Sequence, residues 1–397
     1  MAARLSGHEV SDLCLGKPPL RSLSATDTVA DALSAIKRTG DTYVSIWNCH
    51  HSFIRKEDHK DNNYSNCTCI GKICMVHIIC FLSKPPNLSS PASALNSPIS
   101  ALLPDYNSSL VRHLQPNASL LEAIDVMHEG VQNLVIPIQN KKCSRDSVLD
   151  CLESPNVLHN NSNTYCWLTQ EDVIRYLINS IGVFSPTPAS SINTLGLIDK
   201  QNILAVCYDD PASSALDLLA LSLFHQSSVA IVDSQGKFVG EISPCTLNSC
   251  DETVVPAMAT LSAGDFMAYI DCGGPPEDLV QLVKERLEEQ NLTAALELLG
   301  EETGLSSWSS FSSTSSSDED LCSSGKNWKL GGYSARVLRR SEAIVCYPRS
   351  SLVAVMIQAL AHRVSYVWVV EEDGALTGIV TFDGMLTVFR EHLKSMC

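Results

Sequence analysis

A fourfold internal repeat constrains the fold of this chain more than any other feature of its sequence. Apolar residues recur at positions i, i+3, i+4 and i+7 in four separate stretches, which is the spacing of one buried helix face. The repeat therefore predicts four copies of one structural unit. The four sets are Val29, Ala32, Leu33 and Ile36; Leu120, Ala123, Ile124 and Met127; Leu216, Leu219, Ala220 and Leu223; and Val353, Met356, Ile357 and Leu360.

A run rich in β-branched and aromatic residues follows each predicted helix and predicts a strand. In the third and fourth copies a short Gly-containing turn leads into a further strand, so we expect a hairpin there. In the first and second copies polar inserts, residues 48–70 and 139–164, replace this turn and are expected on the surface. The predicted strands cover residues 42–47, 133–138, 228–233 and 365–370.

Each unit closes with a strand that turns directly into a helix. One strand–helix–strand–strand–helix unit cannot bury both faces of its small sheet, so the units should pair. We predict an α/β (α+β) fold of four β-α-β-β-α units in two paired modules. The predicted boundaries are 10–84 for the first unit, 98–182 for the second, 183–194 for a linker, 195–250 for the third unit, 251–340 for an insertion and 341–397 for the fourth.

The predicted insertion divides into two parts of different composition. Residues from about 262 to 300 carry apolar side chains at helical spacing and predict helices. Residues from about 304 to 335 are rich in serine, cannot form a core and are predicted to be disordered. The serines ahead of the acidic run 318–320 are candidate phosphorylation sites, because acidic-directed kinases select that context; they are Ser315, Ser316 and Ser317.

Charge and composition exclude several classes of protein. The 397 residues include 28 basic and 44 acidic side chains, a net charge of −16 that disfavours binding to nucleic acid or to anionic membrane surfaces. No run reaches the roughly 18 consecutive apolar residues of a membrane-spanning helix. The N-terminal residues lack the apolar core of a signal peptide, and the 16 cysteines are scattered. We expect a soluble protein of a reducing compartment, the cytoplasm first and the nucleus second.

Neither a catalytic motif nor a complete metal motif stands out. The sequence has no nucleophile elbow, phosphate-cradling glycine loop or His-Glu-x-x-His helix, so we predict no enzyme. Metal-type ligands gather around the first insert, yet the Cys67-x-Cys69 spacing is too tight for a usual zinc pair. Structural zinc and a polar insert with free thiols remain alternatives. The ligand types in question are Cys49, His50, His51, His59, Cys67, Cys69, Cys74 and His77.

The order of elements, with a closing turn such as Gly378-Ile-Val-Thr381, resembles the CBS domain. Two CBS repeats form an adenosine-binding regulatory unit called a Bateman module. Residues 12–20, 241–244, 260–265 and 341–345 resemble plant proteins made only of CBS repeats. The four-repeat layout is similar to the gamma subunit of AMP-activated, SNF1-related kinases, which reports energy status. The resemblance implies two Bateman modules that pair within one chain or across a homodimer.

In the CBS family the closing turn carries Thr/Ser-x-x-Asp, which implies a ligand site. A carboxylate there can take both ribose hydroxyls, and the helix start suits a phosphate. Only the second repeat keeps the pattern, as Thr169 and Asp172. In the fourth repeat Gly384 occupies the position of the acid. Asp383 precedes it by one residue, which places the Asp383 side chain about 100° around the helix axis from the acid position. The degenerate pairs are Cys74 with His77, Ser243 with Thr246, and Thr381 with Asp383.

A second departure from the kinase gamma subunits concerns charge. Those subunits carry basic residues at the start of the middle strand, where they hold phosphate. The matching positions here, 42–43, 132–133, 227–228 and 365–366, are uncharged. His362 and Arg363 lie three places earlier in the chain, from where their side chains could swing in to take this role.

Three hypotheses follow. The first is a non-catalytic sensor that binds AMP, ADP, ATP or S-adenosylmethionine at Thr169 and Asp172 and modulates an SNF1-related kinase or a metabolic or redox enzyme. The second is a ligand-free interaction scaffold built from CBS pairs. The third is a zinc-dependent assembly through the first insert.

Overall fold

Four small sheets organise the chain in the computed structural model, which describes residues 8–48, 68–103, 110–139, 163–271, 275–299 and 343–396. Each sheet has three strands, and its middle strand pairs with a parallel first strand and an antiparallel third strand. The predicted β-α-β-β-α order of each unit is therefore confirmed. The strands are β1 (Ser22–Ser24), β2 (Val44–Asn48) and β3 (Thr68–Ile73); β4 (Val111–His113), β5 (Asn133–Gln139) and β6 (Asn163–Thr169); β7 (Ala205–Cys207), β8 (Val229–Val232) and β9 (Phe238–Ile242); and β10 (Val345–Cys346), β11 (Tyr366–Val370) and β12 (Leu376–Thr381).

Two helices complete each unit, one between its first two strands and one after its third. The predicted start of the first helix is present as a capping box: Thr28 Oγ1 accepts from Asp31 N at 3.2 Å, and Asp31 Oδ2 accepts from Thr28 N at 3.0 Å. Gly40 ends that helix in the left-handed region, at φ 65°. The paired helices are α3 (Val29–Thr39) and α4 (Met75–Leu82); α8 (Leu120–His128) and α9 (Gln170–Asn179); α10 (Leu216–His225) and α11 (Pro244–Leu247); and α18 (Leu352–His362) and α19 (Phe382–Met396).

Further helices lie before and between these elements. The predicted helical part of the insertion contains α13 (Ala263–Tyr269), α14 (Glu277–Glu289), α15 (Thr293–Leu296) and η6 (Glu297–Leu299). The serine-rich part lies outside the described residues. The remaining helices are α2 (Val10–Leu13), α5 (Pro85–Leu88), α6 (Pro91–Leu95), η1 (Ile99–Leu102), η2 (Ile181–Phe184), η3 (Thr187–Ala189), η4 (Ala212–Ala215), η5 (Glu252–Val254) and α12 (Val255–Thr260).

Successive units pair sheet against sheet, as predicted. In the first pair the rings of Trp47 and Tyr165 pack at a tilt of 45° with centroids 5.2 Å apart, beside Val111 and Val135 in a small buried cluster. In the second pair the hydroxyl of Tyr366 and the indole N–H of Trp368 donate to the buried carboxylate of Glu241, at 2.9 Å and 2.7 Å. These contacts hold each module together across its two sheets.

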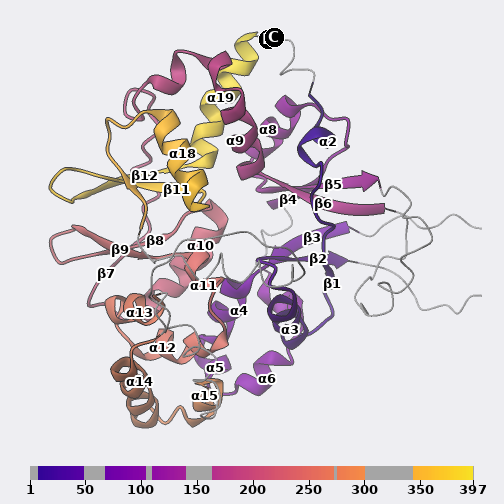
Figure 1. The fold of residues 1–397 in the computed structure, drawn as a ribbon. Helices are drawn as coiled ribbons and strands as arrows, with labels where there is room; N and C mark the ends of the chain where they lie inside the picture. Colours follow the sequence, from indigo (N-terminus) through magenta and orange to yellow (C-terminus); the bar gives the residue numbers. More distant parts are fainter. Residues whose placement is uncertain are drawn as a thin grey trace, which may run out of the picture.

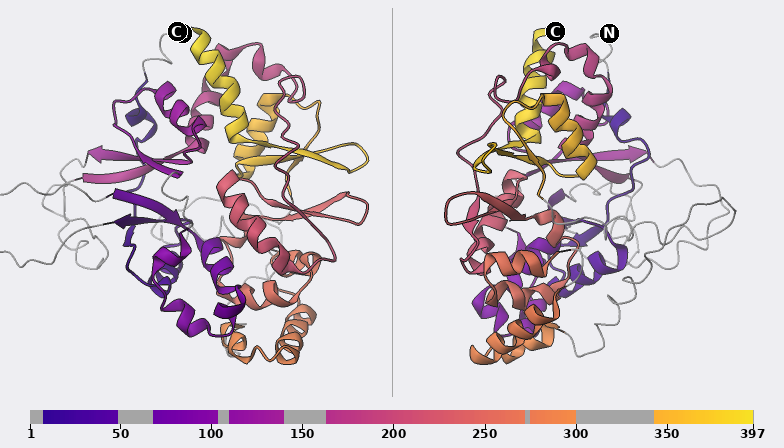
Figure 2. Two further views of the ribbon diagram at one scale, coloured as in Figure 1. Left: turned by 180° about the vertical axis from the view of Figure 1, so that it is seen from behind. Right: turned by 60° about the vertical axis from the view of Figure 1, so that its left-hand side comes forward.

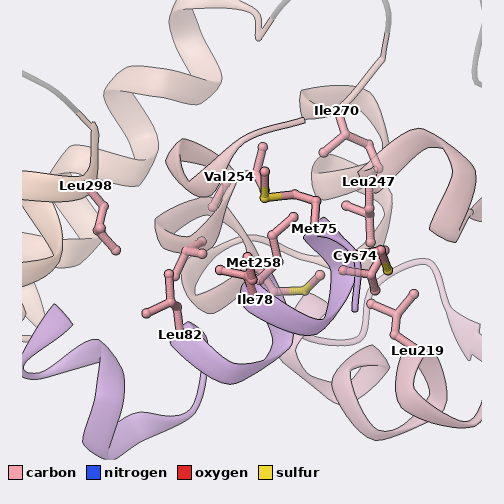
Figure 3. Packing of buried hydrophobic residues seen from close by; sticks show 14 of the residues in the cluster. Cys74, Met75, Ile78, Leu82, Leu219, Leu247, Val254, Met258, Ile270 and Leu298 are labelled. Atoms are coloured by element: carbon pink, nitrogen blue, oxygen red, sulfur yellow. The ribbon is translucent and has the colours of Figure 1, made fainter. Parts of the chain in front are cut away.

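The two modules then pack on one another within the single chain (Figures 1 and 2). One apolar cluster joins the first and third units, with α4 packed among α10, α11 and α12 (Figure 3). A second cluster joins the second and fourth units, where α19 crosses α8 and α9. Arg390 and Lys394 of α19 also pair with Asp125 of α8, at 2.5 Å and 2.9 Å. The four units thus surround one centre.

The predicted buried faces hold for the first two helices and fail in part for the other two. All four predicted apolar residues of α3 and of α8 are buried. On α18 the buried face is instead formed by Leu352, Val355, Met356 and Ala359, while Ile357 is 54% exposed. On α10 Leu219 is buried but Ala220 is exposed. Both helices are apolar on more than one side, so periodicity alone does not select the face that the fold covers.

Candidate functional site

A cavity of about 1010 Å³ lies where the four units meet. The starts of all four middle strands reach it, and these are the positions at which the sequence shows uncharged residues in place of the gamma-subunit basic ones. Part of the α10 apolar stripe lines the same space, through Leu216, Ala220 and Leu223, which explains why that stripe is not core. The strand-start residues on the wall are Thr42, Tyr43, Gln132, Asn133, Ser227, Ser365 and Tyr366.

The basic groups of the cavity come from positions other than the strand starts. Lys72 of β3, Lys84 ahead of α5 and Arg363 at the end of α18 line the wall, as do the acids Glu171 and Asp217. The ammonium of Lys72 lies 4.3 Å from the ring centroid of Tyr43. Burial lowers the pKa of Lys72 to about 8, because the charged form loses water contact there. An anionic ligand would stabilise the ammonium of Lys72.

Backbone conformation singles out two of the lining residues. Gln226 and Arg363 follow the last residues of α10 and α18 in the left-handed region, at φ 51° and 53°. Glycine takes a positive φ at the corresponding ends in the first two units, as Gly40 and Gly130. A side chain in this region costs on the order of 1 kcal/mol relative to glycine. The last two units therefore place polar residues at the cavity where glycine would be less strained.

Two residues of the wall each carry a buried polar atom that has no hydrogen-bond partner among the described residues. They are Asn133 Nδ2 and Ser227 Oγ, in residues that are 3% and 4% exposed. Leaving such a group unpaired costs about 1–3 kcal/mol, so native proteins rarely do so without a bound group. One donor and one hydroxyl, beside basic side chains and an apolar helix face, match a ligand that carries both an anionic group and a polar ring system.

Of the two residues that the sequence proposed as the ligand site, only Thr169 lies on the cavity wall. Thr169 lines the cavity and caps α9, and its Oγ1 donates to Asp172 Oδ2 at 2.7 Å. The same carboxylate oxygen accepts from Thr169 N at 2.8 Å and from Lys17 Nζ at 2.5 Å. Asp172 is not among the residues that line the cavity. The capping role is thus present in the structure, and the ligand role stays a prediction.

Lys17 is the residue that sequence reasoning missed at this turn. Its ammonium also donates to Trp167 O at 2.8 Å, so it bridges the end of β6 and the start of α9. Lys17 and Asp172 lie 155 residues apart in sequence, and no local pattern connects them. Only the path of the N-terminal segment across the second unit brings them together.

The degenerate pairs occupy the same helix starts in the other units. In the first, Cys74 N donates to His77 Nδ1 at 3.2 Å; His77 lines the cavity, and burial lowers its pKa to about 4. In the third, Ser243 Oγ accepts from Cys245 N at 3.1 Å, while Thr246 is not on the cavity wall. The fourth unit carries Thr381, whose Oγ1 accepts from Gly384 N at 3.3 Å, and Asp383, which is exposed.

Several other predictions fall partly or wholly outside the described residues. The candidate phosphorylation sites Ser315, Ser316 and Ser317 lie in the undescribed range 300–342, and the cysteines and histidines from 49 to 67 lie in the first insert. Within the described residues no group of His, Cys, Asp and Glu is arranged to hold a metal ion. The zinc hypothesis therefore stays a prediction. No helix of the described part is long and apolar enough to cross a membrane.

Comparison with known proteins identifies the repeated unit. The family model described as "CBS domain" matches residues 336–391. The chain is 46% identical to the CBS domain-containing protein CBSX5 of Arabidopsis thaliana over 403 aligned positions, which cover 100% of both chains. It is 19% identical to the SNF1-related protein kinase regulatory subunit gamma-like PV42b of the same plant, over 99% of this chain and 97% of the relative.

A solved structure shares the whole fold. The crystal structure of MJ1225 from Methanocaldococcus jannaschii, described as a putative archaeal homolog of g-AMPK, matches with a TM-score of 0.53 and 14% identity. The match covers 96% of this chain and 100% of that chain. The four-unit arrangement is therefore shared with a solved protein, and the full-length identity to CBSX5 places the chain: it belongs to the family of plant CBS domain-containing proteins built from CBS repeats.

Proposed function

We propose that this protein is a non-catalytic regulator that binds an adenosine-containing ligand in its central cavity and passes the binding state to a partner protein. The observation that carries the proposal is the composition of the cavity wall. Lys72, Lys84 and Arg363 provide positive charge, while Asn133 and Ser227 each have a buried polar atom that finds no hydrogen-bond partner in the part of the chain that the structure describes. A phosphate near the basic groups and a ribose or base at the polar atoms would satisfy both needs.

The apolar stretch of the wall supports an aromatic base as part of the ligand. Leu216 and Leu223 of α10 and Phe81 of α4 line the cavity without joining the fully buried core. A nucleobase can cover such side chains, because its faces are apolar and its edges hydrogen-bond. AMP, ADP, ATP and S-adenosylmethionine all carry adenosine and are the ligands that we propose to test.

The partner that we propose is an SNF1-related kinase, or a metabolic or redox enzyme. Support for the kinase comes from a full-length relative whose name is that of a gamma-like regulatory subunit. We place this regulation in the cytoplasm, with the nucleus as a second location.

Calorimetric titration of the full chain with each of the four ligands tests the proposal. Arg363→Ala should weaken binding of the phosphorylated ligands roughly 10- to 100-fold, because a charged hydrogen bond contributes about 1.5–3 kcal/mol. Arg349→Ala is the matched control, since Arg349 is exposed and is not on the cavity wall. Equal losses in both variants would argue for nonspecific charge attraction instead.

The same titration on Asp172→Ala separates the two candidate positions for the ribose. If Asp172 holds ribose hydroxyls, this variant should lose affinity for all four ligands. If Asp172 serves only Thr169 and Lys17, affinity should change little while thermal stability falls. Absence of heat with any of the four ligands would reject the sensor and favour the ligand-free scaffold.

A further inference from the structure

The N-terminal segment lies on the second CBS repeat before the chain enters the first. Val10 N donates to Ala118 O at 2.9 Å, and ten residues further on Leu20 N donates to Tyr165 O in β6 at 2.8 Å. The Val10 side chain is fully buried in the apolar cluster of the second and fourth repeats. The segment from Val10 to Leu20 therefore runs as a strap across the second repeat, anchored at both ends.

A tight turn in this strap brings Lys17 to the junction of β6 and α9. Lys17 N donates to Cys14 O at 3.2 Å, and Gly16 takes a positive φ of 77° in the turn. The Lys17 ammonium donates to Trp167 O at 2.8 Å and to Asp172 Oδ2 at 2.5 Å. One side chain of the strap thus contacts both the end of β6 and the first turn of α9.

The residues at this junction form part of the cavity wall or hold it in place. Trp167, Thr169 and Glu171 line the cavity, whereas Lys17 and Asp172 do not. Asp172 Oδ2 accepts from the backbone N–H and from the hydroxyl of Thr169, at 2.8 Å and 2.7 Å. The Thr169 hydroxyl has therefore used its only proton, and its oxygen can act toward a ligand only as an acceptor. Lys17 fixes this arrangement through the same carboxylate oxygen.

The charge of the Lys17–Asp172 pair matters for an anionic ligand. The two side chains are 22% and 23% exposed, so water screens this pair less than it screens an ion pair on the open surface. With Lys17 in place, the ammonium neutralises the carboxylate. Without Lys17, an uncompensated negative charge would remain in hydrogen-bond contact with Thr169 of the wall and would repel a phosphate in the cavity.

We propose that Lys17 is a positioning residue of the ligand cavity, and that docking of the N-terminal strap regulates ligand binding through it. The inference rests on the proposed function, because it concerns the same ligand in the same cavity. Lys17 acts through Asp172: it holds the carboxylate that orients Thr169, and it cancels the charge of that carboxylate. Docking of the strap therefore favours binding of a phosphorylated ligand, and by linkage the ligand favours docking of the strap to the same degree.

Calorimetric titration of the full chain measures the effect of Lys17 on ligands of different charge. Lys17→Met should lower the affinity for AMP and ATP about 10-fold, the order of magnitude expected for one uncompensated charge near a phosphate at an effective dielectric constant of about 20. The loss for S-adenosylmethionine should be smaller, because this ligand carries no phosphate. Lys17→Arg keeps the positive charge and should retain most of the affinity for AMP.

A second substitution at Asp172 tests whether charge is the cause. Asp172→Asn removes the negative charge and keeps a side-chain oxygen that can accept from Thr169 N. In the Lys17→Met background it should restore most of the lost affinity for AMP, which a purely structural role of Lys17 would not allow. Arg21→Met is the matched control and should leave the affinity unchanged, because Arg21 directly follows the strap and pairs with Asp41 away from the cavity wall, at 2.6 Å.

Hydrogen exchange of the strap measures the reciprocal effect. Saturating AMP should slow exchange of the Val10 and Leu20 amides in the wild-type chain and should do so less in Lys17→Met. If AMP binds both chains equally, this role of Lys17 is wrong and the proposed function stands. Equal losses for all ligands in Lys17→Met, without rescue by Asp172→Asn, would also refute the role, because that is the result of a purely structural contact. If no ligand binds the wild-type chain, the proposed function fails and the role of Lys17 fails with it.

Discussion

Replacing Lys72 by methionine should raise the free energy of unfolding and lower the affinity for the ligand. Methionine keeps the apolar stem and removes the charge. The pKa of Lys72 falls from its ordinary value of 10.5 to about 8 on folding, a shift that corresponds to about 3.4 kcal/mol of destabilisation of the charged form. Contact of the ammonium with the Tyr43 ring offsets part of this destabilisation. Lys72 is also only partly buried, so solvent screening reduces the destabilisation further. We expect Lys72→Met to gain about 1–2 kcal/mol at pH 7.

The stability difference between the wild-type chain and Lys72→Met should depend on pH. Below pH 8 lysine is charged in both folded and unfolded chains, so the folded state bears the whole penalty. Between pH 8 and 10.5 the folded state releases its proton first, and the stability of the wild-type chain should rise relative to that of Lys72→Met. Above pH 10.5 the lysine is neutral in both states, and the penalty is gone.

Urea unfolding at pH 7 and at pH 10, for the wild-type chain and Lys72→Met, measures this difference. The variant should be the more stable at pH 7 and lose most of that advantage at pH 10. The calorimetric titration described above should show weaker binding of phosphorylated ligands to it. Lys237→Met is the control, because Lys237 is exposed in the turn between β8 and β9 and should change neither quantity. A less stable Lys72→Met at pH 7, or an advantage that does not change with pH, would refute the reasoning.

Three further perturbations test the scaffold around the cavity. Thr28→Ala should cost about 1 kcal/mol of unfolding free energy in urea, because it removes the cap of α3; an unchanged midpoint would mean that the capping box contributes nothing. Glu241→Leu should cost about 1–3 kcal/mol by the same assay, because it removes the acceptor of the buried Trp368 indole N–H and leaves the Tyr366 hydroxyl with Ser243; a stabilised variant would contradict this. Asp125→Ala should lower the thermal midpoint by a few degrees at low salt and by less at high salt, because Arg390 and Lys394 lose their partner; a salt-independent loss would point to packing instead.

Much of the fold could be predicted because its signals are local. The capping residues at Thr28 and Ser119, the short turns of the third and fourth units and the alternation of helix and strand each depend on neighbouring residues. The prediction that Ile357 lies on the buried face of its helix was wrong for a physical reason. An apolar helix without a polar side offers several stripes of equal hydrophobicity, and the choice among them depends on which neighbours the fold supplies.

The candidate site was less predictable, because its parts come from all four units. The sequence placed Thr169 and the uncharged strand starts at a ligand site, and the structure brings these to one cavity. The charges came from elsewhere. Lys72 lies near the end of β3, the third strand of its unit. Arg363 follows α18 in the left-handed conformation that glycine takes in the first two units, and unlike glycine it brings a charged side chain.

The sequence by itself determined the repeat, the order of elements and the family, because these depend on periodicity and turn chemistry within about sixty residues. Only the tertiary structure decided which groups meet. Lys17 reaches Asp172 across 155 residues, because the N-terminal segment crosses the second repeat. The cavity exists because two modules close on each other within one chain. Contacts of that range arise from packing of whole units, which no local pattern encodes.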